Sequence, residues 1–184
     1  MTKNNLFVTK RILSPTIWII ISPLSTSFYL MEKYWEVPQI TQWTQYLLDS
    51  YVHWVAQELI AREGTPLEQA ERLFNSPFAV TSHELQDDPI FNYGNQTALN
   101  LWEMNWHQFT QTPSRLSAEP VNRQERARML AQAKTQGYLS DYRGVRISQS
   151  GKRFLIQHAT VWNIQKPDGT PAGQAATFSK WTYL

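Results

Sequence analysis

The sequence predicts an α+β domain in which helices flank an antiparallel β-sheet, with a helical hairpin in front of it. Its 184 residues suffice for one domain with a hydrophobic core. Apolar residues recur at helical spacing early in the chain, whereas strand-like segments separated by turn signals fill its C-terminal part. An apolar content of 42%, with eight residues each of Trp, Tyr and Phe, excludes an intrinsically disordered chain.

Residues 1–30 differ in composition from the rest of the chain. No charged side chain occurs between Arg11 and Glu32, and basic residues precede this stretch, as they do in a signal peptide or a membrane anchor. The unbroken apolar run from Ile17 to Ile21 is much shorter than the roughly 20 residues that cross a bilayer. Since Met31 is a plausible start in its own right, we favour an upstream extension that is not part of the native protein.

Residues 31–74 are predicted to form the helical hairpin. Between positions 40 and 60, apolar residues recur every three or four residues, which places them on one face of a helix that ends by Gly64. Thr65 and Glu68 have the spacing of a capping box, so a second helix opens there and runs to the end of this segment.

Residues 75–184 are predicted to form the main domain. Its first part contains two short strands, near residues 78–80 and 90–93, which are bounded by prolines and by Gly94. Helical spacing follows over residues 95–103, and a short turn is expected around Trp106 and Phe109.

The second part of this domain begins with a longer helix. Asn122 and Glu125 form a second cap pair at its start, and Gly137 is suited to the left-handed position at its end. Turn signals at Ser150-Gly151 and at Pro167-Asp168-Gly169 then separate three strands of an antiparallel meander. These strands are Tyr142–Ile147, Arg153–Ile164 and Gly173–Trp181.

Charges are sorted along the chain although the formal net charge is only +2. Eleven acidic and three basic side chains lie between Glu32 and Glu103, whereas nine basic and three acidic side chains lie between Arg115 and Arg153. Such a basic half could bind nucleic acid weakly. We favour the simpler interpretation that two oppositely charged halves pack together or keep their helices solvated.

Several reaction types lack the residues that they need. The absence of cysteine excludes disulfides, thiolate nucleophiles, sulfur-ligated zinc and iron–sulfur clusters, and it favours a reducing, cytoplasmic location. No glycine-rich phosphate loop or Gly-x-Ser-x-Gly elbow occurs, and the four histidines lack metal-ligand spacing. We therefore expect no catalytic residues and no metal site, and the sequence indicates no particular cofactor.

Several separated motifs, in the same order along the chain, resemble the MEKHLA domain, a PAS-like family. The resemblance extends over about residues 74–181, and the helical hairpin resembles the leader of free-standing bacterial members. The matching segments are 91–103 (FNYGNQTALNLWE), 113–120 (PSRLSAEP), 137–138 (GY), 142–146 (YRGVR), 159–162 (ATVW) and 173–178 (GQAATF).

This resemblance implies a PAS-like fold and a role in sensing or in protein association. A relative at the C-terminus of plant class III homeodomain–leucine zipper regulators is linked to the control of dimerisation. The present sequence shows neither a homeodomain nor leucine-zipper heptads, which puts direct transcription-factor activity in doubt. It also lacks the cysteine that flavin photosensors and yellow photoactive proteins use to bond their chromophores.

The resemblance also implies a ligand cavity beneath the sheet. His158 is predicted to share a strand face with Ile156, Thr160 and Trp162, and in PAS folds this face lines the cavity. His158 could there bond a ligand or haem iron, although a core histidine satisfied by a hydrogen bond is the favoured alternative. The small residues Gly173, Ala175 and Ala176 would leave room for an apolar pocket.

Other candidate ligand-binding residues are aromatic or basic. Trp102 and Trp106, four residues apart, could flank a flat ligand, although this spacing is more typical of core residues. Arg115 could bind an anion together with Arg143 or Arg146, but those two point to opposite faces of one strand. The candidate site therefore comprises His158, Trp162, Trp102, Trp106 and Arg115.

We conclude from the sequence that a non-catalytic sensory or protein-interaction module is the best reading. Its expected partners are a second copy of the chain, a signalling protein, or a small apolar or aromatic ligand, with no firm sign of nucleic acid or membrane. The alternatives are a small cone-shaped α+β enzyme, which needs an acid or base pair beneath its sheet, and a weak nucleic-acid binder.

Overall fold

The structure, a computed structural model, describes residues 33–184. The prediction for residues 1–30 falls outside this range. Among the helices of residues 33–184, none is both long and apolar enough to span a bilayer.

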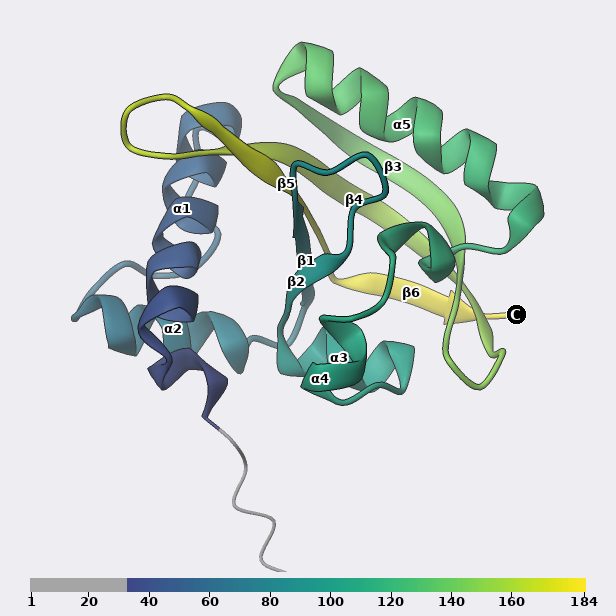
Figure 1. Cartoon of the computed structure of the whole chain (residues 1–184), viewed down its shortest axis with the longest axis horizontal. Helices are drawn as coiled ribbons and strands as arrows, with labels where there is room; N and C mark the ends of the chain where they lie inside the picture. The colour runs from purple at the N-terminus through teal and green to yellow at the C-terminus, as the bar shows by residue number, and fades with distance from the viewer. Residues whose placement is uncertain (1–32) are drawn as a thin grey trace, which may run out of the picture. The chain divides into compact units, whose positions relative to one another are not determined.

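One antiparallel sheet forms the centre of the described region, with the strand order β2-β1-β5-β4-β3, and β6 pairs with the first part of β4 (Figure 1). The predicted three-stranded meander corresponds to β3, β4 and β5, and β6 continues the line of β5 after a break at Ser179. The strands are β1 (Ala79–Glu84), β2 (Phe91–Gly94), β3 (Tyr138–Ile147), β4 (Arg153–Gln165), β5 (Pro171–Phe178) and β6 (Lys180–Tyr183).

Helices surround this sheet, and α5 lies along β3 and β4 (Figure 1). The α-helices of the described region are α1 (Pro38–Val55), α2 (Pro66–Phe74), α3 (Gln96–Trp102), α4 (Trp106–Phe109) and α5 (Arg123–Gln136). Short 3₁₀ helices occur at η1 (Tyr34–Glu36), η2 (Ser114–Ser117) and η3 (Pro120–Asn122).

The N-terminal hairpin is confirmed, but its first helix is shorter than predicted. The capping box forms as expected, because Thr65 Oγ1 accepts from the Glu68 amide and the Glu68 carboxylate accepts from the Thr65 amide. Helix α1 ends at Val55, where Ala56 adopts a left-handed conformation with φ of 59°. The segment after it is held by Arg62, which donates to side chains of both α1 and α2, so tertiary contacts override the helical pattern.

The start of α5 also differs from its prediction. The side chain of Asn122 does not cap the helix. Its Nδ2 donates instead to the Glu119 carboxylate at 3.4 Å. The turn η3 leads directly into α5, so the predicted cap pair of Asn122 and Glu125 is wrong. At the other end, Gly137 has a φ of 90°, as the prediction of a left-handed position requires.

Gly137 also allows a close contact between the ends of two helices. A Cβ at this position would lie 2.2 Å from the indole ring of Trp54, which belongs to the last turn of α1. The end of α5 therefore meets the end of α1 with no room for any side chain at Gly137.

Strand β4 is covered on both faces. Val161 contributes to a cavity beneath α5, whereas the next residue, Trp162, faces α1. The indole N–H of Trp162 donates to the Leu47 carbonyl at 3.2 Å, and its ring packs edge-on against Tyr51 at 5.0 Å between centroids. The sheet thus separates α1 from α5.

A fully buried asparagine joins three elements at the start of the domain. Asn95 Oδ1 accepts from the amides of Val80 in β1, at 2.9 Å, and Ala98 in α3, at 3.1 Å. Its Nδ2 donates to the Phe78 carbonyl at 2.7 Å and to Ser76 Oγ at 2.9 Å. One side chain therefore caps α3 and fixes the entry of the chain into β1.

We predict that Asn95→Ala lowers the free energy of unfolding by about 3 kcal/mol, because several buried donors and acceptors lose their partner at once. Urea unfolding followed by circular dichroism measures the change. The control is Asn100→Ala in the same helix, whose exposed side chain bonds only to Gln96, and we expect a change within about 0.5 kcal/mol. Equal losses in the two variants would contradict the role of Asn95.

Candidate functional site

Two β-bulges face each other in β3 and β4 and decide which side chains reach the interior. The register shifts between Leu139 and Tyr142 in β3 and again between Tyr142 and Gly144, and the bulge residues Asp141 and His158 have φ values of 59° and 52°. Each extra residue reverses the alternation of side chains beyond it. As a result, Ala159 in β4 faces the interior and His158 does not.

The predicted place of His158 on the cavity face is therefore wrong. Its side chain is 61% exposed, and its Nδ1 lies 2.5 Å from Asp141 Oδ1, the other bulge residue. Neither a haem nor an enclosed ligand could be reached from this position.

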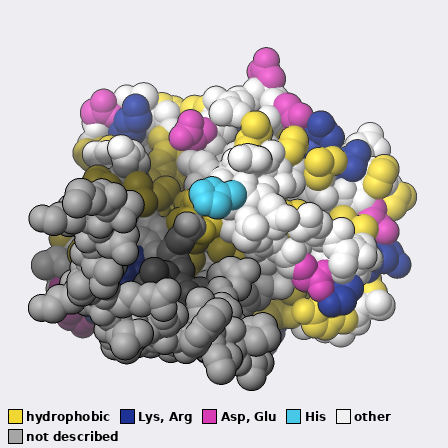
Figure 2. Space-filling model, turned by 60° about the horizontal axis from the view of Figure 1, so that its bottom comes forward, with side chains coloured by type: hydrophobic (Ala, Val, Ile, Leu, Met, Phe, Trp, Pro, Cys, Tyr) yellow, Lys and Arg dark blue, Asp and Glu magenta, His cyan; other side chains and the backbone are white. Residues whose placement is uncertain are grey.

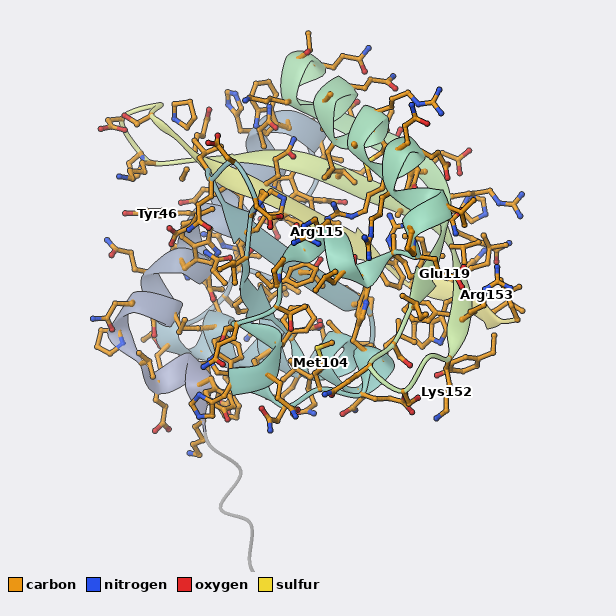
Figure 3. The ribbon with its side chains drawn as sticks, turned by 45° about the vertical axis from the view of Figure 1, so that its right-hand side comes forward. Tyr46, Met104, Arg115, Glu119, Lys152 and Arg153 are labelled. Atoms are coloured by element: carbon orange, nitrogen blue, oxygen red, sulfur yellow. The ribbon has the colours of Figure 1, made fainter. Side chains whose placement is uncertain are left out.

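Trp162, Trp106 and Arg115 also lie away from the space between α5 and the sheet. Trp162 faces α1, as described above, and Trp106 stacks on Tyr34 at 4.6 Å between centroids in the core. Arg115, which is labelled in Figure 3, belongs to η2. Its Nε donates to both carboxylate oxygens of Asp88, at 2.9 and 3.0 Å, and thereby ties η2 to the loop between β1 and β2.

Trp102 is the sequence candidate that does line the interior. It ends α3, because Glu103 adopts a left-handed conformation with φ of 56°, and Trp106 begins the separate helix α4. Trp102 and Trp106 therefore do not form one helical face that could flank a ligand. The Trp102 ring packs edge-on against Phe154, at 5.3 Å, as the core interpretation expects.

The interior beneath α5 is small. A cavity of about 40 Å³, which we call the α5 cavity, lies between α5 and the strands β3 and β4, and a second cavity of about 30 Å³ lies beside it under β1 and β5. Sites for drug-sized ligands enclose roughly 300–1,000 Å³. Neither of these two cavities is the roomy pocket that the sequence led us to expect. Residues lining the α5 cavity include Trp102, Ser117, Arg126, Met129, Tyr142, Arg146, Ile156, Ala159, Val161 and Ala176.

Three residues of β3 occupy much of this space. Tyr142, Gly144 and Arg146 alternate along the strand on its interior side, and the Arg146 guanidinium lies 5.4 Å from the centre of the Tyr142 ring. Arg146 donates to its own neighbour, the Val145 carbonyl, at 2.9 Å, and to the Tyr142 hydroxyl at 3.3 Å. A Cβ on Gly144 would lie 2.2 Å from that hydroxyl, so Gly144 leaves the room that this arrangement needs.

A second buried arginine enters the cavity from α5. Arg126 is 9% exposed and Arg146 is 4% exposed, and among residues 33–184 no hydrogen bond or ion pair is formed by the Arg126 guanidinium. Burial and the positive charge of Arg146 lower the pKa of Arg126 to about 9, so it remains charged at neutral pH. No acidic residue lines the cavity. Burying a charge without a partner typically costs several kcal/mol.

Sequence reasoning missed this arginine pair, although a signal was present. Arg126 stands three residues before Met129 and seven before Ala133, which is the spacing of the buried face of α5. An arginine within an apolar helical face is unusual and could have been identified from that spacing. The predicted opposition of Arg143 and Arg146 is confirmed, since Arg143 is exposed and Arg146 is buried.

Further polar atoms around the interior lack partners. Trp102 Nε1, which belongs to the wall of the α5 cavity, and His83 Nε2, on the wall of the second cavity, are buried without a hydrogen bond. His83 donates from Nδ1 to the Glu84 carbonyl at 3.0 Å, which leaves Nε2 unprotonated. Burial, together with the charge of Arg126, lowers the pKa of His83 below its usual value.

A larger and more open groove of about 560 Å³ lies outside the core. Trp54 of α1, Lys134 of α5 and Gln174 of β5 are among its walls, together with Asn163, whose amide donates to the Lys134 carbonyl at 3.0 Å. Of the small residues expected to make room, Gly173 lines this groove, whereas Ala175 and Ala176 line the second cavity. Across residues 33–184, no three His, Asp or Glu side chains are grouped as a metal site would require.

The buried imidazole predicts a pH dependence. Because the pKa of His83 is lower in the folded than in the unfolded chain, the unfolded chain binds more protons below about pH 6.5, and stability falls as pH falls. We expect the free energy of unfolding to decrease from pH 7 to about 5.5 less steeply in His83→Gln than in the unaltered protein. The three solvent-exposed histidines, His53, His107 and His158, remain in both proteins. Identical slopes would contradict a neutral buried His83.

We predict that Gly144→Ala destabilises the fold by about 1–3 kcal/mol, since the added methyl group meets the Tyr142 hydroxyl and an Arg146 nitrogen. Urea unfolding measures this loss in two backgrounds, the unaltered protein and the Tyr142→Ala variant. The comparison tests whether the clash with the Tyr142 ring causes the loss. The loss should shrink in the second background, where the clashing ring is gone. Additive effects would show that Gly144 is needed for another reason.

Comparisons with known proteins agree with this architecture. Similar solved structures include the PAS domain of a protein from Colwellia psychrerythraea, at 14% identity and a TM-score of 0.54, over 64% of this chain and 94% of that one. An RNA-binding light-oxygen-voltage receptor matches at 13% identity and a TM-score of 0.55, over 66% of this chain and 34% of that one. A light-oxygen-voltage domain studied with a flavin analogue matches at 13% identity and a TM-score of 0.50, over 67% and 88%.

At these identities the similar structures show the fold alone, and that fold is PAS-like. A comparison with curated proteins finds no match. The sequence pattern of the MEKHLA domain matches residues 41–183, which is most of the chain. The protein therefore belongs to the MEKHLA domain family.

Proposed function

We propose that this protein is a non-catalytic sensory module in which the interior between α5 and the sheet receives a small molecule. The observation that carries the proposal is the pair of buried arginines, because Arg126 and Arg146 line a small cavity whose walls offer no acidic partner for either charge. Membership of the MEKHLA family and the PAS-like fold support the same function. A flat aromatic ligand does not fit a space of about 40 Å³.

The two alternatives drawn from the sequence receive less support. An enzyme needs an acid or base positioned at its substrate, and the walls of the α5 cavity carry no carboxylate and no histidine. A nucleic-acid binder needs a continuous basic surface. In this protein Arg126 and Arg146 are buried, and Arg115, Lys152 and Arg153 form ion pairs with Asp88, Glu103 and Glu119.

The paired basic residues lie at the surface. Arg153 donates to the Glu119 carboxylate at 3.0 Å, and both are labelled side by side in Figure 3. Lys152 forms an ion pair with Glu103, whose pKa is lowered to about 2 by hydrogen bonds from Lys152, Ser150 and Ser148. On the face shown in Figure 2, blue basic side chains are interspersed with magenta acidic ones and do not gather into a patch.

Strand β4 offers a direct route from the interior to α1. Val161 lines the α5 cavity, and its neighbour Trp162 donates a hydrogen bond to the Leu47 carbonyl on the other side of the sheet. A ligand that displaces Val161 therefore shifts the strand that anchors α1. We propose that α1 carries this change to a second copy of the chain or to a signalling partner.

Native mass spectrometry of the full chain, purified under mild conditions, tests the proposal together with hydrogen exchange. We expect a non-covalent adduct that is lost on denaturation, and slower amide exchange in residues 44–55 of α1 when the adduct is present. Trp162→Phe, which removes the bond to Leu47, should keep the adduct and lose the effect on α1. The same spectra count the subunits of the complex. A chain that carries no adduct and shows no dimer would contradict a sensory function.

A further inference from the structure

The walls of the α5 cavity offer many hydrogen-bond donors and no anionic acceptor. Each guanidinium has five N–H donors and no acceptor, and the indole of Trp102 adds another donor that has no partner. Arg146 uses two of its nitrogens, toward the Val145 carbonyl and the Tyr142 hydroxyl, and both acceptors are neutral. Arg126 uses none within residues 33–184. The cavity is thus rich in donors and positively charged.

The surroundings of Arg126 add to the positive potential at its guanidinium. Arg126 lies close to the N-terminal end of α5, where the helix dipole contributes further positive potential. The nearby charge that acts on it is that of Arg146, which repels it. No carboxylate of the described residues contributes. Two like charges held together in a buried place are stabilised best by an anion between them.

We propose that the α5 cavity binds a small oxyanion, held by the guanidinium groups of Arg126 and Arg146. This inference rests on the proposed function and names the class of ligand for the same interior. A planar guanidinium matches the paired oxygens of a carboxylate or of an inorganic oxyanion and can bond both at once. The volume of about 40 Å³ limits the ligand to a few heavy atoms, the size of formate, acetate or nitrate.

The apolar part of the wall agrees with a small carboxylate. Met129, Ile156 and Val161 line the same cavity and could contact a methyl group, whereas the arginines engage the oxygens. An inorganic oxyanion would use the arginines alone. A small carboxylate and an inorganic oxyanion would both bind through the guanidinium groups. Testing each kind of anion separately distinguishes them.

Thermal unfolding of the full chain gives the first test. The protein is dialysed into a low-salt buffer, and formate, acetate, nitrate, phosphate or chloride is added as the sodium salt at matched ionic strength. We expect formate, acetate or nitrate to raise Tm in a saturable way, while chloride and the larger phosphate give only the shift that ionic strength produces. Isothermal titration calorimetry then measures the affinity.

Matched arginine variants test the site. Arg126→Met should bind the preferred anion at least tenfold more weakly, and Arg128→Met, an exposed position in the same helix, should bind it normally. Arg146→Met and the exposed Arg143→Met form a second matched pair in β3. Arg126→Lys keeps the charge but loses the planar fork, and we expect intermediate binding. This variant keeps the test decisive if Arg126→Met does not fold.

The proposal is overturned if no anion shifts Tm of the unaltered protein more than that of Arg126→Met or Arg126→Lys, because the cavity then holds only water. That result leaves the sensory function standing if native mass spectrometry still detects another adduct coupled to α1. Conversely, saturable anion binding that leaves exchange in α1 unchanged supports the anion site and counts against the sensory function.

Discussion

The two facing bulges in β3 and β4 are the constraint on which the interior depends. Because Asp141 and His158 both take left-handed conformations, the side-chain alternation reverses in each strand at the same level of the sheet. Tyr142 and Arg146 of β3 are thereby directed under α5 together with Ala159 and Val161 of β4. A sheet without the bulges would direct His158 inward and leave Val161 on the side of α1. Which side chains line the α5 cavity therefore depends on the backbone conformation at the two bulges as well as on the amino-acid sequence.

Local signals were the part of the fold that the sequence predicted well. The capping box at Thr65, the positive φ of Gly137 and the turns of the β3–β4–β5 meander depend on a few neighbouring residues, and all are present. The end of α1 and the start of α5 were predicted less well, because distant partners decide them. Arg62 holds the chain after α1, and Asn122 bonds to Glu119 and leaves the helix uncapped.

The candidate site was predicted poorly for a related reason. A strict alternation along β4 assigned His158 to the interior, and a single bulge residue was enough to make that assignment wrong. Histidine and aspartate tolerate positive φ better than most residues, so Asp141 and His158 are compatible with bulges, but neither marks one as clearly as glycine would. Only Trp102 among the candidates reached the cavity. Arg146 was considered only as a possible anion-binding partner of Arg115, and Arg126 was counted only among the charges of the basic half, although both are buried.

The contact between Gly137 and Trp54 has a mechanical consequence for the whole domain. The ends of α1 and α5 touch there directly, at one margin of the sheet that otherwise separates them. A glycine has no side chain, and only for that reason can the backbone after α5 lie against the indole ring of α1. Any larger residue at position 137 would have to displace Trp54, so the spacing of the two helix ends depends on this one position.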